Sequence, residues 1–213
     1  MPVPAIKSYL SQFKTELSKR AECNKGQYPW WRLQRPRDRN KMLHGERILV
    51  PLYSTKNRFY HSKEAVVGMT DIYIISTTNI LYSAAYLSAV LNSKLLNKYH
   101  SIICKVKRAG YLEYSGEKIS KLPIRRISFT TPISERTLMK TEIQELYGAA
   151  KFDEIRSIVD ACLPKDEAGN FIAELEKSDV VHDLLAFLAE RMLEMKQASN
   201  RRSKAFWAGW RAK

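Results

Sequence analysis

The stretch ILVPLYSTKNRFYHSKEAVVGMTDIYIIST, residues 48–77, decides the fold class of this chain. It contains three short runs rich in Ile, Val, Tyr and Phe, at residues 48–53, 58–62 and 71–77, separated by the breaks STKN and VVGMT. β-Branched and aromatic residues favour strands, whereas polar or Gly-containing breaks favour turns. The three runs therefore predict a small, mostly antiparallel sheet.

Helical patterns lie on both sides of this predicted sheet. Residues 4–20 repeat apolar side chains every three or four positions, which is one face of a helix. Residues 79–99 carry a second apolar stripe of the same kind. After it, residues 121–127 (KLPIRRI) are predicted to form a last edge strand, because Pro123 cannot donate a hydrogen bond to a central ladder.

The composition changes after this segment, and the remainder of the chain is helical in pattern. Pro132 suits the first turn of a helix that stops at Gly148, and Ser178 suits the N-cap of a later one. The three helices are predicted at residues 132–147, 152–163 and 178–195. The whole pattern predicts an α+β fold with packed helices in residues 1–127, followed by a C-terminal helical subdomain in residues 128–213.

The net charge of +14 is unevenly distributed along the chain. Residues 1–127 hold 23 Lys and Arg against 8 Asp and Glu, whereas residues 128–195 hold 7 against 14. A positive field confined to one segment is typical of a surface that binds a polyanion, because cations that neutralise phosphates release condensed counterions. No run is long and apolar enough to span a membrane, and the N-terminal residues lack a signal-peptide layout, so we expect a cytoplasmic protein without membrane association.

The densest basic stretch is YPWWRLQRPRDRNK, residues 28–41. In an extended segment Arg35, Arg37, Arg39 and Lys41 project to one side, at a pitch comparable to that of successive phosphates on a nucleic-acid strand. Arginine also chelates the N7 and O6 edge of guanine, and a tryptophan can stack on a base or sugar. The alternative is that the tryptophans are core anchors and that the charges are solvated.

Two further basic segments lie in predicted loops. KVKRAGYLEY, residues 105–114, combines cations with a glycine that permits close approach of the backbone, although it is also compatible with an ordinary helix exit. STKNRFY, residues 54–60, falls in a hairpin loop, where recognition residues are common. The residues predicted to face DNA are Trp31, Arg32, Arg35, Arg37, Arg39, Lys41, Lys56, Arg58, Lys105, Lys107, Arg108 and Tyr111.

The sequence contains no phosphate-binding Gly-rich loop, no His-Glu-x-x-His and no Gly-x-Ser-x-Gly. Its four histidines lack metal-ligand spacing, and its three cysteines are far apart. We therefore predict no catalytic residue, no metal ligand and no cofactor within the chain. Two segments with glutamate followed by lysine, Glu174-Leu175-Glu176-Lys177 and Glu194-Met195-Lys196, are similar to the Glu-x-Lys of metal-dependent nucleases and leave a nuclease fragment open as an alternative. A protein-interaction module with a basic face is another.

An ordered set of motifs within residues 5–127 resembles the TaqI-like C-terminal specificity domain, the target-recognition domain of adenine-specific DNA methyltransferases. This group includes the fused restriction and modification enzymes called type IIG. The motifs are Tyr28-Pro29-Trp30-Trp31, Arg35-Pro36-Arg37, Arg47-Ile48-Leu49-Val50-Pro51, Phe59, Ile72-Tyr73-Ile74, Tyr86-Leu87, Leu91-Asn92-Ser93-Lys94-Leu95-Leu96, Lys107-Arg108-Ala109-Gly110-Tyr111 and Leu122-Pro123-Ile124.

The resemblance implies a division of labour within a larger enzyme of restriction-modification or phage defence. A methyltransferase core would bind S-adenosylmethionine and modify a flipped adenine, while this domain would bind double-stranded DNA and read the target. The core's Asn/Asp-Pro-Pro-Tyr/Phe motif does not occur here. We therefore expect a C-terminal part of such an enzyme, with double-stranded DNA and the methyltransferase core as its partners and without activity of its own.

Overall fold

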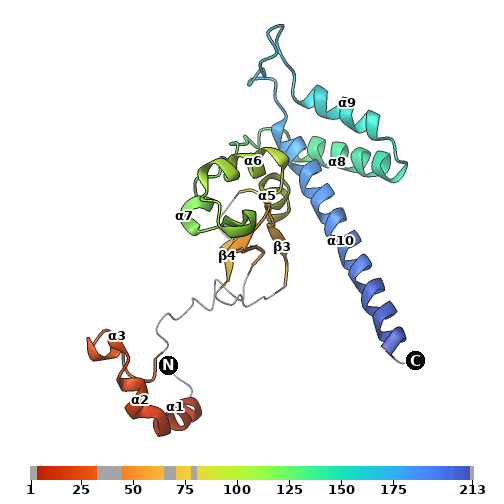
Figure 1. Ribbon diagram of the computed structural model, residues 1–213. Helices are drawn as coiled ribbons and strands as arrows, with labels where there is room; N and C mark the ends of the chain where they lie inside the picture. Colours follow the sequence, from red (N-terminus) through yellow and green to blue (C-terminus); the bar gives the residue numbers. More distant parts are fainter. Residues whose placement is uncertain (1–3, 33–44, 65–70, 78–80, 212–213) are drawn as a thin grey trace. The chain divides into compact units, whose positions relative to one another are not determined.

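The computed structural model describes residues 4–32, 45–64, 71–77 and 81–211, with side chains up to Ser203 (Figure 1). The chain forms two compact units, Met1–Leu43 and His44–Lys213. The first unit contains short helices, and the second contains the sheets and the longer helices.

The first unit begins with α1 (Pro4–Leu10), the 3-10 turn η1 (Ser11–Phe13), α2 (Lys14–Ser18) and α3 (Ala21–Asn24). The helix predicted for residues 4–20 is therefore confirmed, although a 3-10 turn interrupts it. None of these elements has a buried residue. Because a helix needs an apolar face against a partner to gain stability from packing, the described residues of this unit form no core of their own.

The predicted antiparallel sheet is confirmed in the second unit. Strand β1 (Arg47–Pro51) is central, with β3 (Tyr60–Ser62) on one side and β4 (Ile72–Ser76) on the other. Ile48 pairs with His61 and with Ile75, which fixes the register. A second ladder, which the sequence patterns did not predict, joins β2 (Tyr53–Ser54) to β5 (Leu112–Glu113).

Helices α5 (Ala84–Leu91) and α6 (Lys94–Ile103) replace the single helix predicted for residues 79–99. The break follows from Ser93, whose hydroxyl accepts a hydrogen bond from the Leu96 N–H at 3.2 Å and so caps a new helix. The 3-10 turn η2 (Arg108–Gly110) and the short α7 (Gly116–Ile119) follow.

The edge strand predicted for residues 121–127 was wrong, because this segment forms a turn and then irregular backbone. Pro123 removes one donor, and the N–H of Ile127 donates to the Tyr82 hydroxyl at 3.2 Å instead of to a ladder. The segment therefore runs across the helices without joining the sheet.

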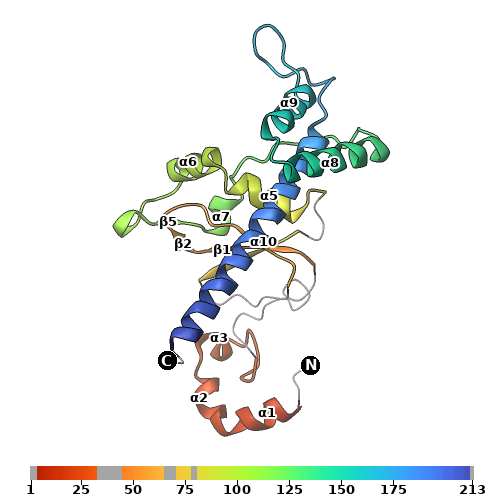
Figure 2. The ribbon, with the colours of Figure 1, turned by 90° about the vertical axis from the view of Figure 1, so that its right-hand side faces the viewer.

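The C-terminal helices are α8 (Ile133–Gly148), α9 (Phe152–Cys162) and α10 (Ser178–Arg211). The first two match the predicted bounds closely, whereas α10 continues well beyond residue 195. One core lies among β1, α5, α6 and β5, and a smaller core lies among the C-terminal helices. Helix α10 belongs to both, because Leu184 lies in the smaller core and Leu185 packs against the larger one. Figures 1 and 2 show α10 running alongside α5. The boundary between residues 127 and 128 stays a prediction.

Candidate nucleic-acid interface

Two basic segments that are about 50 residues apart in sequence leave the same end of the β2–β5 ladder. Ser54 pairs with Leu112 in this antiparallel ladder. The loop that follows Ser54 and the hairpin that precedes Leu112 are therefore neighbours, since opposite residues of an antiparallel pair have Cα atoms about 5 Å apart. Figure 2 shows the hairpin as the green projection beyond the labels of β2 and β5. We call the loop of residues 55–59 together with the hairpin of residues 105–111 the basic edge.

Side chains alternate between solvent and core along residues 56–59 of the loop. Lys56 and Arg58 are exposed, while Asn57 and Phe59 are buried. The loop therefore presents two cations outward on a base that is fixed in the core.

The hairpin has a tight tip with an unusual backbone. The Lys107 N–H donates to the Tyr111 carbonyl at 2.7 Å, which closes the turn. Ala109 and Gly110 both have left-handed backbone, with φ of 58° and 74°. This conformation costs an alanine about 1 kcal/mol, and such strain is concentrated at functional sites. The tip exposes Arg108, and Tyr111 remains 44% exposed.

The cations of the basic edge are largely free of carboxylates. Lys107 Nζ lies 3.3 Å from Glu113 Oε2, so its charge is partly neutralised. Within the described residues, no carboxylate lies within 4.0 Å of the other four cations, Lys56, Arg58, Lys105 and Arg108. The acidic C-terminal region pairs with cations elsewhere, for example with Lys63 through Glu190 at 2.9 Å and with Arg125 through Glu176. The basic edge therefore keeps a positive potential available to a polyanion.

The remaining predicted DNA-facing residues belong to the first unit. Trp31 is half-buried with the Lys7 ammonium 5.8 Å from its ring centroid, and Arg32 is exposed. The Arg20 guanidinium holds this segment, donating to the carbonyls of Trp30 and Arg32. Trp31 thus already has a cation against its ring. The ladder of Arg35, Arg37, Arg39 and Lys41 lies outside the described residues.

A buried polar network beneath the basic edge escaped sequence reasoning. Tyr114 is fully buried and stacks on His100 at 4.1 Å, and its hydroxyl donates to Asn57 Oδ1 at 2.9 Å. Burial raises the pKa of Tyr114 to about 12, raises the pKa of the Cys104 thiol and lowers the pKa of His100. The network is therefore uncharged at neutral pH. The only sequence feature that pointed to this network was Asn57, a polar residue without charge between Lys56 and Arg58.

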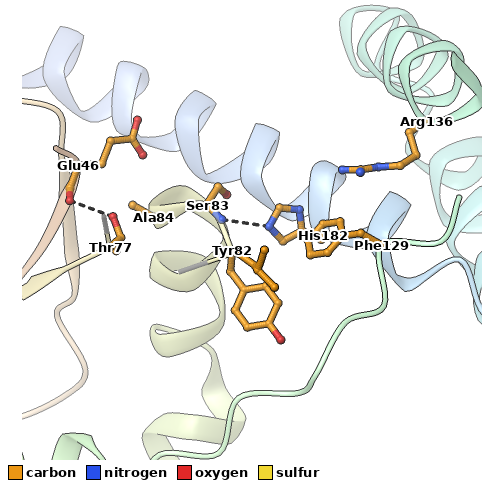
Figure 3. A pocket seen from close by; sticks show the side chains of 9 residues that line it. Glu46, Thr77, Tyr82, Ser83, Ala84, Phe129, Arg136 and His182 are labelled. Atoms are coloured by element: carbon orange, nitrogen blue, oxygen red, sulfur yellow. Dashed lines mark hydrogen bonds between the residues drawn. The ribbon is translucent and has the colours of Figure 1, made fainter. Parts of the chain in front are cut away.

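A hollow of about 580 Å³ lies near the N-terminus of α5, and no residue of the basic edge lines it (Figure 3). His182 of α10 accepts a hydrogen bond from the Ser83 N–H at 3.2 Å through Nε2, and its Nδ1 lies 2.9 Å from Asp183 Oδ1. Arg136 of α8 donates to both carboxylate oxygens of Asp183. The polar groups of His182 and Arg136 are thus engaged with other protein groups, and they hold α8, α10 and α5 together.

The described part of the chain contains no cluster of three or more His, Cys, Asp and Glu side chains that could hold a metal ion. In the segment Glu174–Lys177, Glu176 pairs with Arg125, and Lys177 pairs with Glu135 at 2.6 Å. In the segment Glu194–Lys196, Glu194 pairs with Arg191 at 2.6 Å. Over the same described residues, no helix is both long and apolar enough to cross a membrane.

A small antiparallel sheet packed against helices defines an α+β domain. The loops at one end of its β2–β5 ladder carry cations without a carboxylate partner in the described part of the chain, which suits the domain to binding a polyanion. Residues 5–124 match the TaqI-like C-terminal specificity domain, so the chain belongs to that family. The match covers more than half of the chain and includes the whole basic edge. No curated protein matches the chain. The family places the chain among DNA target-recognition domains of methyltransferase and restriction-modification systems.

Proposed function

We propose that this chain is the target-recognition part of an adenine-specific DNA methyltransferase, in a type IIG restriction-modification enzyme or a related phage-defence system. In this proposal the methyltransferase core of the parent enzyme is a partner and carries S-adenosylmethionine, while the present chain binds the duplex in the cytoplasm. The observation that carries the DNA-binding role is the basic edge, where two loops bring to one end of the β2–β5 ladder four cations that have no carboxylate partner among the described residues.

The binding mode follows from the kinds of side chain available. The four cations of the basic edge without a carboxylate partner would contact phosphates and set the register on the duplex. They are Lys56, Arg58, Lys105 and Arg108. Arg58 and Arg108 can also reach bidentate acceptors on a guanine, and Tyr111 can pack on a sugar or base. Family membership supports the DNA-binding role, and the resemblance to the target-recognition domain of adenine-specific DNA methyltransferases supports the adenine-specific parent.

Duplex binding tests this function through its salt dependence. We expect retention on a mixed-sequence DNA duplex that falls by about 10³ to 10⁵ between 50 and 200 mM salt, as for six to ten phosphate contacts. Replacing Lys56 and Arg58 by alanine should lower the slope of log affinity against log salt by about two. The matched control is Lys140→Ala with Arg156→Ala, which removes the same charge from exposed positions of α8 and α9.

The outcomes separate the alternatives. Indifference to DNA at 50 mM salt would favour a protein-interaction module, and magnesium-dependent cutting would favour a nuclease. An equal loss of affinity in the control would show that net charge, and not the basic edge, governs binding. Mapping of N6-methyladenine in cells that carry the intact parent gene tests the adenine-specific part of the proposal.

A further inference from the structure

The two loops of the basic edge share one buried anchor, Asn57. Its backbone N–H donates to Asn97 Oδ1 at 2.8 Å, and its Nδ2 donates to the Leu91 carbonyl at 2.6 Å. Its Oδ1 accepts the hydrogen bond from the Tyr114 hydroxyl. Asn57 stands between Lys56 and Arg58, so a shift of the backbone at Asn57 would move both cations. Asn57 is 8% exposed, so these groups have little water as an alternative partner.

Tyr114 is the residue that connects Asn57 to the hairpin. Its N–H donates to the Leu52 carbonyl at 2.8 Å, next to β2, and its ring packs edge-on against Phe59 with centroids 5.9 Å apart. The stacked His100 lies 2.9 Å from the Cys104 sulfur through Nε2, and the thiol donates to the Glu113 carbonyl at 3.1 Å. The hairpin of residues 105–111 lies between Cys104 and Glu113. Tyr114 thus connects the base of the hairpin to the base of the loop.

Two further asparagines, Asn92 at the C-cap of α5 and Asn97 in α6, also hold this loop. Asn92 Oδ1 accepts from the Phe59 N–H at 3.0 Å, and its Nδ2 donates to the Phe59 carbonyl at 2.7 Å. Asn97 holds the N–H of Asn57. The loop that bears Lys56 and Arg58 is therefore fixed at two consecutive inward positions. Groups held in this way keep a recognition side chain close to its productive geometry.

We propose that the Tyr114–Asn57 hydrogen bond is a positioning contact that makes the loop and the hairpin a single DNA-reading edge. This inference rests on the proposed DNA-binding function. Neither residue touches DNA, since both are buried; they act by fixing the spacing between the cations of the loop and those of the hairpin. A polar network is suited to this role because its hydrogen bonds are directional, whereas apolar packing of the same volume tolerates rotation.

Tyr114→Phe tests the link, because it removes the hydroxyl and keeps the ring that stacks on His100. With a mixed-sequence duplex as the probe, we expect affinity to fall and the salt slope to fall by about two, as if the contacts of Lys56 and Arg58 were lost. The effect should be non-additive. In the Tyr114→Phe background, replacing Lys56 and Arg58 by alanine should cost much less affinity than it does in the unmodified chain.

Thr131→Val is the matched control. It also removes a buried hydroxyl, which donates to Asp179 Oδ1 at 2.7 Å, but it does so in the C-terminal helical part. We expect it to lower the melting temperature without changing the affinity or the salt slope. Should Tyr114→Phe be too unstable to assay, Asn97→Ala removes the acceptor for the Asn57 N–H from a half-buried helical position and should show the same non-additivity.

The results distinguish this inference from the proposed function. If the unmodified chain does not bind duplex at 50 mM salt, both proposals are wrong. If it binds and Tyr114→Phe behaves like Thr131→Val, or its effect simply adds to that of Lys56→Ala with Arg58→Ala, the DNA-binding function stands and the positioning role is wrong.

Discussion

At the scale of single residues, His100 makes the stability of the protein sensitive to mild acid. The side chain is fully buried, and burial lowers its pKa below the ordinary value near 6.5. The unfolded chain therefore binds a proton at a pH where the folded chain does not. The free energy of unfolding should be highest above about pH 6.5 and should fall as the pH drops toward the lower folded pKa, by at most about 1.4 kcal/mol per pH unit.

His100→Gln removes this titration and isolates the effect. Urea unfolding at pH 7.5 and at pH 5.5 should give a larger drop in the free energy of unfolding for the unmodified protein than for the variant. Tyr114 and Cys104 touch the imidazole, but their raised pKa values keep them neutral throughout this range. Parallel pH profiles would contradict the prediction.

The sequence predicted the exposed cations of the basic edge, but it did not predict the buried hydrogen bonds that hold their loops in place. Lys56, Arg58 and Arg108 could be predicted from composition and turn signals, because exposure of a charged loop is a local property. The partnership of Asn57 with Tyr114 spans 57 positions and depends on the pairing of β2 with β5, which are only two residues each. Strands that short carry no usable periodicity.

At the scale of elements, Arg136 is expected to be the main electrostatic tie between α8 and α10. Its guanidinium donates to both oxygens of Asp183 and lies 5.0 Å from the Phe129 ring centroid. Desolvation raises the pKa of Asp183, but the hydrogen bonds of His182 and Arg136 outweigh it and hold the pKa below its ordinary value. Arg136→Ala should lower the free energy of unfolding by about 2 to 3 kcal/mol, because it leaves a mostly buried carboxylate without its cation.

Arg191→Ala provides the comparison within α10. Arg191 pairs with Glu194 at 2.6 Å on an exposed surface, where such pairs contribute about 0.5 kcal/mol or less. Chemical denaturation of both variants should therefore give clearly different losses of stability. Equal losses would mean that the Arg136 pair is no better than a surface ion pair.

Helices and strands with a clear local sequence pattern could be predicted. The wrong predictions concern segments in which a capping residue or a proline acted against the apolar pattern. The strands β1, β3 and β4 and the helices α8 and α9 followed from β-branched runs and apolar spacing. The stripe across residues 79–99 hid a helix break, because Ser93 caps α6 without interrupting the apolar period. The run at residues 121–127 resembled a strand, but Pro123 has no N–H to donate to a ladder, and the Ile127 N–H donates to the Tyr82 hydroxyl.

At the scale of the whole molecule, both hydrophobic cores are built from residues beyond position 43. The sequence predicted where basic and acidic segments lie and the family to which they belong. It did not predict that α10 contributes to both cores, because contacts between distant helices leave no local trace. The boundary between the two compact units follows Leu43, so the whole basic stretch of residues 28–41 belongs to the first unit.

Removal of residues 1–43 tests this organisation and the sequence-only prediction for the arginine ladder together. The described helices of the first unit bury no side chain, so the shortened protein should unfold cooperatively, with a melting temperature within about 2 °C of that of the full chain. It also loses Arg32, Arg35, Arg37, Arg39 and Lys41. If these residues contact phosphates as predicted, the salt slope of duplex binding should fall by about four to five. An unchanged slope would confine DNA binding to the basic edge, whereas a loss of cooperative unfolding would show that the first unit supports the second.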